Sequence, residues 1–342
     1  MTPSRSTSIL AAFALIAAAI PAQEMPKPAP QLAKLKALEG HWQGSGTAQM
    51  QPGAPATEWT AVSTYQWALG GFWLQCDTAI DFAGMGAMRL REYLGWDGEN
   101  QRYINLAVAN SGEAMLSTAH VGDGEMVLMM QRVKGGHPEV ERARTKFTAE
   151  KMEFTIAFFG PEGGAADAVQ GTLRKVAKVE MPALSAAGPI APAAPQMAKV
   201  AKMAGVYEGK GEMIMAPGAP PMAIGGRDTM TALFGGGIVM TETKGTAGPP
   251  YEAHGFHAWS PMHGCYKINS FDSMGMICDM DGRLTDTAMI CTSSCLRMGM
   301  PCAARCVVSL DKDGKPTKVV NHSCMGDAPP MQDFTMTYAR GK

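Results

Sequence analysis

Four cysteines near the C-terminal end of the chain have a spacing that could do chemistry. The pattern C-x3-C-x6-C-x3-C is formed by Cys291, Cys295, Cys302 and Cys306. In a β-hairpin with its turn midway, the outer two lie opposite each other and so do the inner two. Because the spacing of four is even, all four side chains share one face, and opposite Cβ atoms ~4.5–5.5 Å apart can be bridged with local twist. The spacing therefore favours two disulfides, Cys291 with Cys306 and Cys295 with Cys302.

Other arrangements of the thiols stay open. A single zinc ion held by all four would require helices, because strand residues four apart are separated by ~13 Å. Mixed or unbonded thiols are the remaining alternative. Cys265 and Cys278 flank another turn and are a further candidate pair, whereas Cys76 and Cys324 have no evident local partner. Seven of the eight cysteines follow residue 260.

Three histidines could in principle bind a metal. His254, His257 and His263 have the spacing H-x2-H-x5-H. On a strand, the first two point to opposite faces, so they are weak metal candidates. The 28 methionines include several Met-x-Met pairs, which suit Cu(I), but they are spread over the whole chain, which favours a role as core filler. We predict no cofactor, with haem or copper as alternatives.

The sequence carries no recognised catalytic signature. It has no Gly-x-Ser-x-Gly, phosphate-binding loop, H-E-x-x-H or dinucleotide fingerprint. Lys and Arg total 30 against 31 for Asp and Glu, a balance that argues against a nucleic-acid partner. These absences favour a non-catalytic protein.

An internal repeat organises the chain. Gly40-His41-Trp42 returns as Gly205-Val206-Tyr207, and Pro52-Gly-Ala-Pro55 returns as Pro217-Gly-Ala-Pro220, both at an offset of 165. The repeat predicts a first unit at 30–178, a Pro/Ala-rich linker at 179–194, and a Cys-rich second unit at 195–342.

Each unit has a β pattern. Phe154, Ile156 and Phe158 alternate with polar or small residues, and Asp-Gly turns recur between such segments. Each unit opens with a short helical pattern that begins near a proline and ends at Gly40 or Gly205. We therefore predict an all-β chain of two tandem antiparallel barrels, each opened by a short helix.

The N-terminal segment has the features of an export signal. Arg5 precedes an apolar run of about 12 residues, which is too short for the ~20 that a spanning helix needs. We predict a signal peptide at 1–22, no membrane span after its removal, and a periplasmic or extracellular protein. Disulfides persist in such compartments.

The helix followed by Gly-x-Trp resembles the lipocalin-like (calycin) barrels. With the Leu-Gly-Gly-x-Trp that ends at Trp73 and the Trp-Asp-Gly that begins at Trp96, the unit resembles the exported family called domain of unknown function 1579. The second copy departs from the pattern, since Tyr207 replaces the Trp of the first copy and Ser260 replaces Asp97. The family brings no established catalytic residues.

The resemblance implies roles for several aromatic and basic residues. It implies that an aromatic residue of the first strand closes each barrel against an arginine of the last strand. These barrel-closing residues are Trp42 with Arg174 and Tyr207 with Arg340. The repeated aromatic pairs are the candidate ligand-binding residues: Trp96, Tyr103, Trp259 and Tyr266.

The expected function is non-catalytic binding of a small, partly apolar molecule within a barrel. A haem- or metal-dependent activity in the second unit is one alternative, because similar barrels such as nitrobindin hold haem through a single His. A structural or interaction module is the other alternative.

Overall fold

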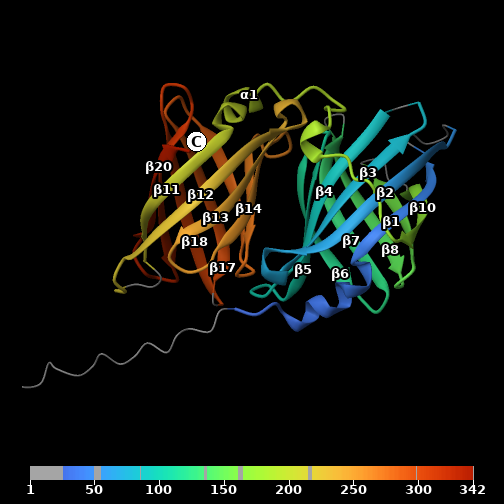
Figure 1. The fold of residues 1–342 in the computed structure, drawn as a ribbon, viewed down its shortest axis with the longest axis horizontal. Helices are drawn as coiled ribbons and strands as arrows, with labels where there is room; N and C mark the ends of the chain where they lie inside the picture. The colour runs from blue at the N-terminus through green and yellow to red at the C-terminus, as the bar shows by residue number, and fades with distance from the viewer. Residues whose placement is uncertain are drawn as a thin grey trace, which may run out of the picture.

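The computed structural model describes residues 26–341 apart from 50–54, 85, 135–136, 161–164, 215–217 and 298. Over these residues the chain forms two closed antiparallel barrels of ten strands each, one after the other (Figure 1). The predicted all-β fold of two tandem barrels is confirmed. The predicted export signal lies outside the described residues. No helix in the described part of the chain has the length and apolarity to span a bilayer.

The first barrel begins with a 3₁₀ helix, η1 (Pro30–Leu38). Its strands and its second short helix are β1 (Gly40–Ala48), β2 (Thr57–Ala68), η2 (Leu69–Gly71), β3 (Trp73–Phe82), β4 (Gly86–Asp97), β5 (Arg102–Ala109), β6 (Ala114–Val121), β7 (Glu125–Lys134), β8 (His137–Phe147), β9 (Lys151–Phe159) and β10 (Ala165–Val176).

The second barrel follows η3 (Leu184–Ala186), which lies in the linker, and opens with α1 (Met197–Val200) and η4 (Ala201–Met203). Its remaining elements are β11 (Gly205–Met213), β12 (Met222–Leu233), η5 (Phe234–Gly236), β13 (Ile238–Ala247), β14 (Glu252–Ser260), β15 (Cys265–Asp272), β16 (Ile277–Leu284), β17 (Ala288–Arg297), β18 (Met300–Leu310), β19 (Pro316–Met325) and β20 (Met331–Arg340).

One end of each barrel is closed by the opening helix and an aromatic residue of the first strand. Trp42 Nε1 donates to the Leu38 carbonyl at 2.7 Å, and Tyr207 Oη donates to the Met203 carbonyl at 2.6 Å. Both acceptors lie four residues earlier, at the end of the helical segment. A different aromatic residue therefore makes the same closure in each copy.

The basic partner of Trp42 differs from the sequence expectation. Lys175 lies opposite Trp42, with Nζ 5.3 Å from the ring centroid, whereas Arg174 lies opposite Gln43. In the second barrel, Arg340 lies opposite Tyr207. The placement of Arg174 was one residue out of register, and neighbouring residues of a strand point to opposite faces.

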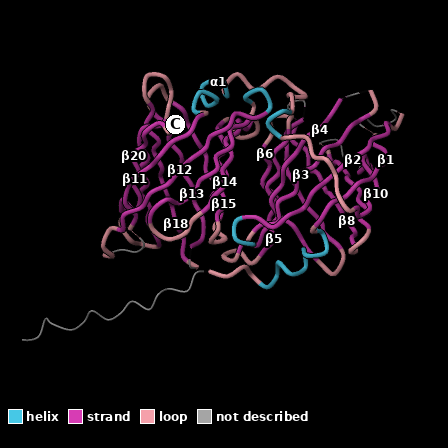
Figure 2. Tube along the Cα trace, viewed as in Figure 1, coloured by secondary structure: helices cyan, strands magenta, loops and turns pink. Residues whose placement is uncertain are grey.

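The barrels pack side by side through an apolar core of their own (Figure 2). The Trp73 ring lies 4.8 Å from that of Phe271, and its Nε1 donates to the Asp272 carbonyl at 2.9 Å. Tyr93 Oη lies 2.7 Å from His254 Nδ1. Because its outer face packs in this core, β5 is buried on both faces from Tyr103 to its end. This explains its almost continuous apolar sequence.

The linker also packs against the two barrels. Leu184 and Ala187 contact the core between them. Asn110 Nδ2 donates to the Gly188 carbonyl, and the Ile190 amide donates to the Asn110 carbonyl, at 3.0 and 2.9 Å. Figure 1 shows the opening helices at opposite ends of the two barrels. The second barrel is therefore inverted relative to the first.

Candidate ligand-binding cavity between the barrels

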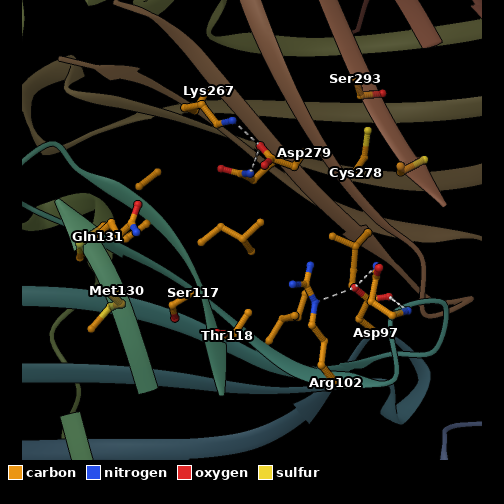
Figure 3. Close-up of a pocket in the computed structure, with 18 of the residues that line it drawn as sticks. Asp97, Arg102, Ser117, Thr118, Met130, Gln131, Lys267, Cys278, Asp279 and Ser293 are labelled. Carbon is orange, nitrogen blue, oxygen red and sulfur yellow. Dashed lines mark hydrogen bonds and ion pairs between the residues drawn. The ribbon is translucent and has the colours of Figure 1, made fainter. Parts of the chain in front are cut away.

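A cavity of about 1420 Å³ lies where the two barrels face each other (Figure 3). Its walls come from β5, β6 and β7 of the first barrel and from β15, β16 and β17 of the second. The turns after Asp97 and Ser260 contribute further lining residues. The volume exceeds the ~300–1,000 Å³ of most small-molecule pockets.

Each barrel opens towards this cavity through a gap between two strands. The β6–β7 ladder pairs only Thr118–Val121 with Met126–Met129. The β16–β17 ladder pairs only Asp281–Leu284 with Met289–Thr292. Beyond these pairs both strands continue without further ladder pairs, and we call the two gaps seam 1 and seam 2.

The seams expose inner-face residues to the cavity. Ser117 lies opposite Asn105 on the inner face of the first barrel, and it lines the cavity. Cys278 lies opposite Ser270 on the inner face of the second barrel, and it also lines the cavity. The cavity therefore reaches from the groove between the barrels into the edge of both interiors.

Methionine dominates the apolar part of the wall. Six methionines line the cavity: Met115, Met129, Met130, Met262, Met274 and Met276. Of the six large hydrophobic side chains that are exposed in the described chain, four lie here: Met129, Met262, Met276 and Leu296. Flexible thioether side chains adapt to ligands of different shape. Such a concentration of exposed apolar groups is typical of a binding site.

A polar cluster from the second barrel borders the cavity. Lys267 Nζ lies 2.8 Å from Oδ1 of both Asp279 and Asp281, and Asn269 Nδ2 donates to Asp279 Oδ1 at 2.9 Å. Burial acts to lower the pKa of Lys267, but its hydrogen bonds to the two carboxylates raise the pKa overall. The ammonium group therefore stays charged. Figure 3 shows it directed at Asp279.

A smaller polar group lies on the first barrel. Asp97 is buried, and it accepts from Asn100 Nδ2 at 2.7 Å and pairs with Arg102 Nε at 3.4 Å. Asp97 also accepts from the Asn100 amide at 3.1 Å, which stabilises the turn. Four carboxylates but only two Lys or Arg side chains line the cavity. The excess of acid disfavours an anionic ligand.

The predicted ligand-binding aromatics divide between two roles. Tyr103 Oη donates to the Gln31 carbonyl at 2.6 Å, and Tyr266 Oη donates to the Gln196 carbonyl at 2.8 Å. These tyrosines thus hold the start of each opening helix. Trp96 and Trp259 each pack edge-on against the tyrosine of their own barrel, and Trp259 also lines the cavity.

The hairpin cysteines lie where the sequence spacing predicts. The β17–β18 ladder pairs Cys291 with Cys306 and Cys295 with Cys302. The structure contains no disulfide among the described cysteines. The pair Cys265 and Cys278 does not fit the register, because Cys278 lies opposite Ser270. The two residues are also on opposite faces, because Cys278 shares the face of Ser270 and Cys265 is five residues from Ser270 on the same strand.

The three histidines do not converge. His254 is on the outer face against Tyr93, His257 is on the inner face of β14, and His263 lies 2.9 Å from Ser260 Oγ in a turn. Burial lowers the pKa of both His254 and His257 to about 4. Among the described residues, no group of three or more His, Cys, Asp or Glu side chains is arranged to hold a metal ion.

Sequence reasoning did not identify the cavity. Its polar cluster comes from Lys267, Asn269 and Asp279, and the first two alternate with apolar residues as in any strand. One available signal was the pair Met274 and Met276 next to a Gly-containing turn. The packing of one barrel on the other creates the site, and neither repeat alone encodes it.

The fold and the helix-closed ends define a tandem lipocalin-like, or calycin-like, barrel protein. The model of the family described as protein of unknown function (DUF1579) matches residues 27–174 and 194–340. The chain belongs to this family and contains two copies of its domain.

Other comparisons add little to this assignment. The search of curated proteins gives no match. Rv2717c from M. tuberculosis is 15% identical with a TM-score of 0.36, over 44% of this chain and 99% of its own. A protein of unknown function from the DUF3598 family of Nostoc punctiforme is 9% identical with a TM-score of 0.26, over 92% and 100%. At these TM-scores, neither structure bears on function.

Proposed function

We propose that the protein binds a small, partly apolar molecule in the cavity between its barrels, without transforming it. The observation that carries the proposal is the gathering of exposed apolar side chains on this one cavity. Exposed apolar area lowers the stability of a protein in water unless a partner covers it. A ligand with an apolar body would cover Met129, Met276 and Leu296.

The charges of the wall narrow the class of ligand. Arg102 and Lys267 are already paired with carboxylates. An anionic headgroup would have to displace a carboxylate from one of them. The ligand that fits best therefore has a neutral or cationic polar part.

A pair of fluorescent probes tests both parts of the proposal. N-phenyl-1-naphthylamine is neutral, and 1-anilinonaphthalene-8-sulfonate is the same molecule with a sulfonate added. We expect saturable binding of the neutral probe, with quenching of tryptophan emission through Trp259, and at least tenfold weaker binding of the sulfonate. Equal affinity for both probes would contradict the inferred ligand class.

A matched pair of variants tests whether the neutral probe binds in this cavity. Met276 is 40% exposed and lines the cavity, whereas Met300 is 42% exposed and is outside its lining. We expect Met276→Lys to weaken binding of the neutral probe by about tenfold, or ~1.4 kcal/mol. Met300→Lys should leave the affinity unchanged. Similar effects of both variants would place the bound probe elsewhere.

The predicted export from the cell remains part of the proposal. An exported protein would meet an oxidising compartment, in which the Cys291–Cys306 and Cys295–Cys302 pairs of the β17–β18 hairpin could form disulfides. Their directly opposite positions support this expectation.

A further inference from the structure

Seam 2 places two cysteines on facing strand edges. The β16–β17 ladder ends with Asp281 opposite Thr292. Both strands continue past this pair, β16 back to Ile277 and β17 on to Arg297. Each remains paired on its other side, β16 with β15 and β17 with β18. Seam 2 is therefore an interruption between two strands whose other edges are paired.

The register shows what closure of seam 2 would bring together. Each further step of the ladder lowers the β16 number by one and raises the β17 number by one. Three steps beyond Asp281 and Thr292, the extended ladder would place Cys278 opposite Cys295. Directly opposite residues have Cα atoms ~4.5–5.5 Å apart, which is within the range of a disulfide.

Both thiols lie on the side that the bond requires. Cys278 is three residues from Asp281, and Cys295 is three residues from Thr292, so the two face the same way once the ladder extends. Both line the cavity. Cys278 is half-buried, and Cys295 is exposed. Burial, and then the nearby Cys306 and Cys295, raise the pKa of Cys278 to about 12.

We propose that Cys278 and Cys295 form a disulfide that closes seam 2 and restricts the cavity on the side of the second barrel. Cys295 then has two alternative partners, Cys278 across the seam and Cys302 across the β17–β18 hairpin. A bond to Cys302 leaves the seam open, and a bond to Cys278 closes it. The effect on the ligand rests on the proposed function, whereas the bond itself does not.

The oxidant is a low-molecular-weight disulfide such as oxidised glutathione. The Cys295 thiolate attacks one sulfur of the oxidant, forms a mixed disulfide and releases one thiol. The Cys278 thiol loses its proton and attacks the Cys295 sulfur, which releases the second thiol. The two protein thiols lose two electrons and two protons, and the oxidant gains them. The high pKa of Cys278 slows this second step, because the thiolate is the attacking form.

Peptide mapping of the full-length protein tests the bond. Trypsin separates the relevant cysteines into peptides 268–283, 284–297 and 298–305. Because Cys291 shares a peptide with Cys295, the mapping uses Cys291→Ser as the background. After oxidation by glutathione, we expect 268–283 linked to 284–297, and we expect more of this product when Cys302→Ser is added. Cys295→Ser should abolish it. Linkage of 284–297 to 298–305 alone, or no linkage to 268–283 even with Cys302→Ser, would overturn the proposal.

Probe binding then tests closure separately. In the Cys291→Ser/Cys302→Ser variant, we expect N-phenyl-1-naphthylamine to bind at least tenfold more weakly after oxidation than after treatment with dithiothreitol. The same variant with Cys295→Ser should show no change. A linked protein with unchanged affinity would overturn closure while leaving the proposed function intact. A reduced protein that binds no probe would overturn the proposed function, and the mapping would still decide whether the bond forms.

Discussion

The two barrels open on one cavity through equivalent seams, but the residues on the strand edges of the two seams differ. In the second barrel, extension of the ladder would oppose Cys278 to Cys295. In the first barrel, the corresponding extension would oppose Met115 to Arg132, so no thiol pair is present. Seam 1 can only be held by non-covalent contacts. The duplicated unit therefore has two equivalent openings, of which only the one in the second barrel carries a thiol pair.

The interiors differ as much as the seams do. Leu94 lies opposite Leu74 in the first barrel, and its counterpart His257 lies opposite Val239 in the second. Ser63 lies opposite Trp42, and its counterpart Asp228 lies opposite Tyr207. Helix contacts and barrel closure are the same in both copies, but at these two positions the second interior carries an ionisable group where the first does not. The architecture thus tolerates polar substitution inside if each group is accommodated locally.

The largest expected effect concerns the core between the barrels, where the copies contribute unequal side chains. Trp73 and its counterpart Ile238 are both buried there. We expect Trp73→Ala to lower the free energy of unfolding by about 3–5 kcal/mol, and Ile238→Ala to lower it by less, because the tryptophan removes more apolar contact and a hydrogen bond. Urea unfolding measures both. The control Ile190→Ala, at a residue that is 53% exposed, should change it by less than ~0.5 kcal/mol. A larger loss of stability for Ile238→Ala than for Trp73→Ala would contradict the larger contribution of the first barrel to this core.

The next effect is a pH dependence of stability that we expect from the interior of the second barrel and not from that of the first. The pKa of His257 is lowered by burial to about 4, so the unfolded chain binds more protons between that value and about 6.5. The stability associated with neutral His257 is therefore present above about pH 6.5 and is lost as the pH falls towards 4. We expect about 2 kcal/mol less stability at pH 5 than at pH 7.5 from this group.

His257→Leu, which installs the residue of the first barrel, checks that expectation. It should remove this loss, as measured by urea unfolding at the two pH values. Leu94→Met serves as the matched control in the first barrel and should leave the pH dependence unchanged. An equally steep loss below pH 6.5 in His257→Leu would assign the acid sensitivity to other groups, of which His254 is the first to examine.

The parts of the fold that were predictable from the sequence are those that rest on local spacing. Alternation, Asp-Gly turns and the offset of 165 were sufficient for two β-barrels, and hairpin symmetry was sufficient to place Cys291 opposite Cys306. Arg174 was misplaced because a one-residue drift between repeats inverts the face of a strand.

The cavity could not be predicted because it depends on how the barrels dock. Its walls combine residues more than 150 positions apart, such as Leu116 and Met276. The seams depend on where two neighbouring strands diverge, and alternation alone does not signal this. Tyr103 and Tyr266 were interpreted as ligand contacts because aromatic pairs recur in both copies, but their hydroxyls hold backbone carbonyls of the opening helices.

The smallest expected effect tests whether this repeated tyrosine contact is equally important in both barrels. Tyr103→Phe and Tyr266→Phe each remove one buried hydroxyl donor and leave a carbonyl of Gln31 or Gln196 without it. Each should lower the free energy of unfolding by about 1 kcal/mol, and the two losses should agree within ~0.5 kcal/mol. Hydrogen exchange should show faster opening of η1 in the first variant and of α1 in the second. Neither variant should weaken the binding of N-phenyl-1-naphthylamine, because the new phenylalanine ring still packs against the tryptophan of the same barrel. If Tyr266→Phe weakened probe binding without accelerating hydrogen exchange at α1, Tyr266 would be a ligand contact. The two closed ends would then not be equivalent.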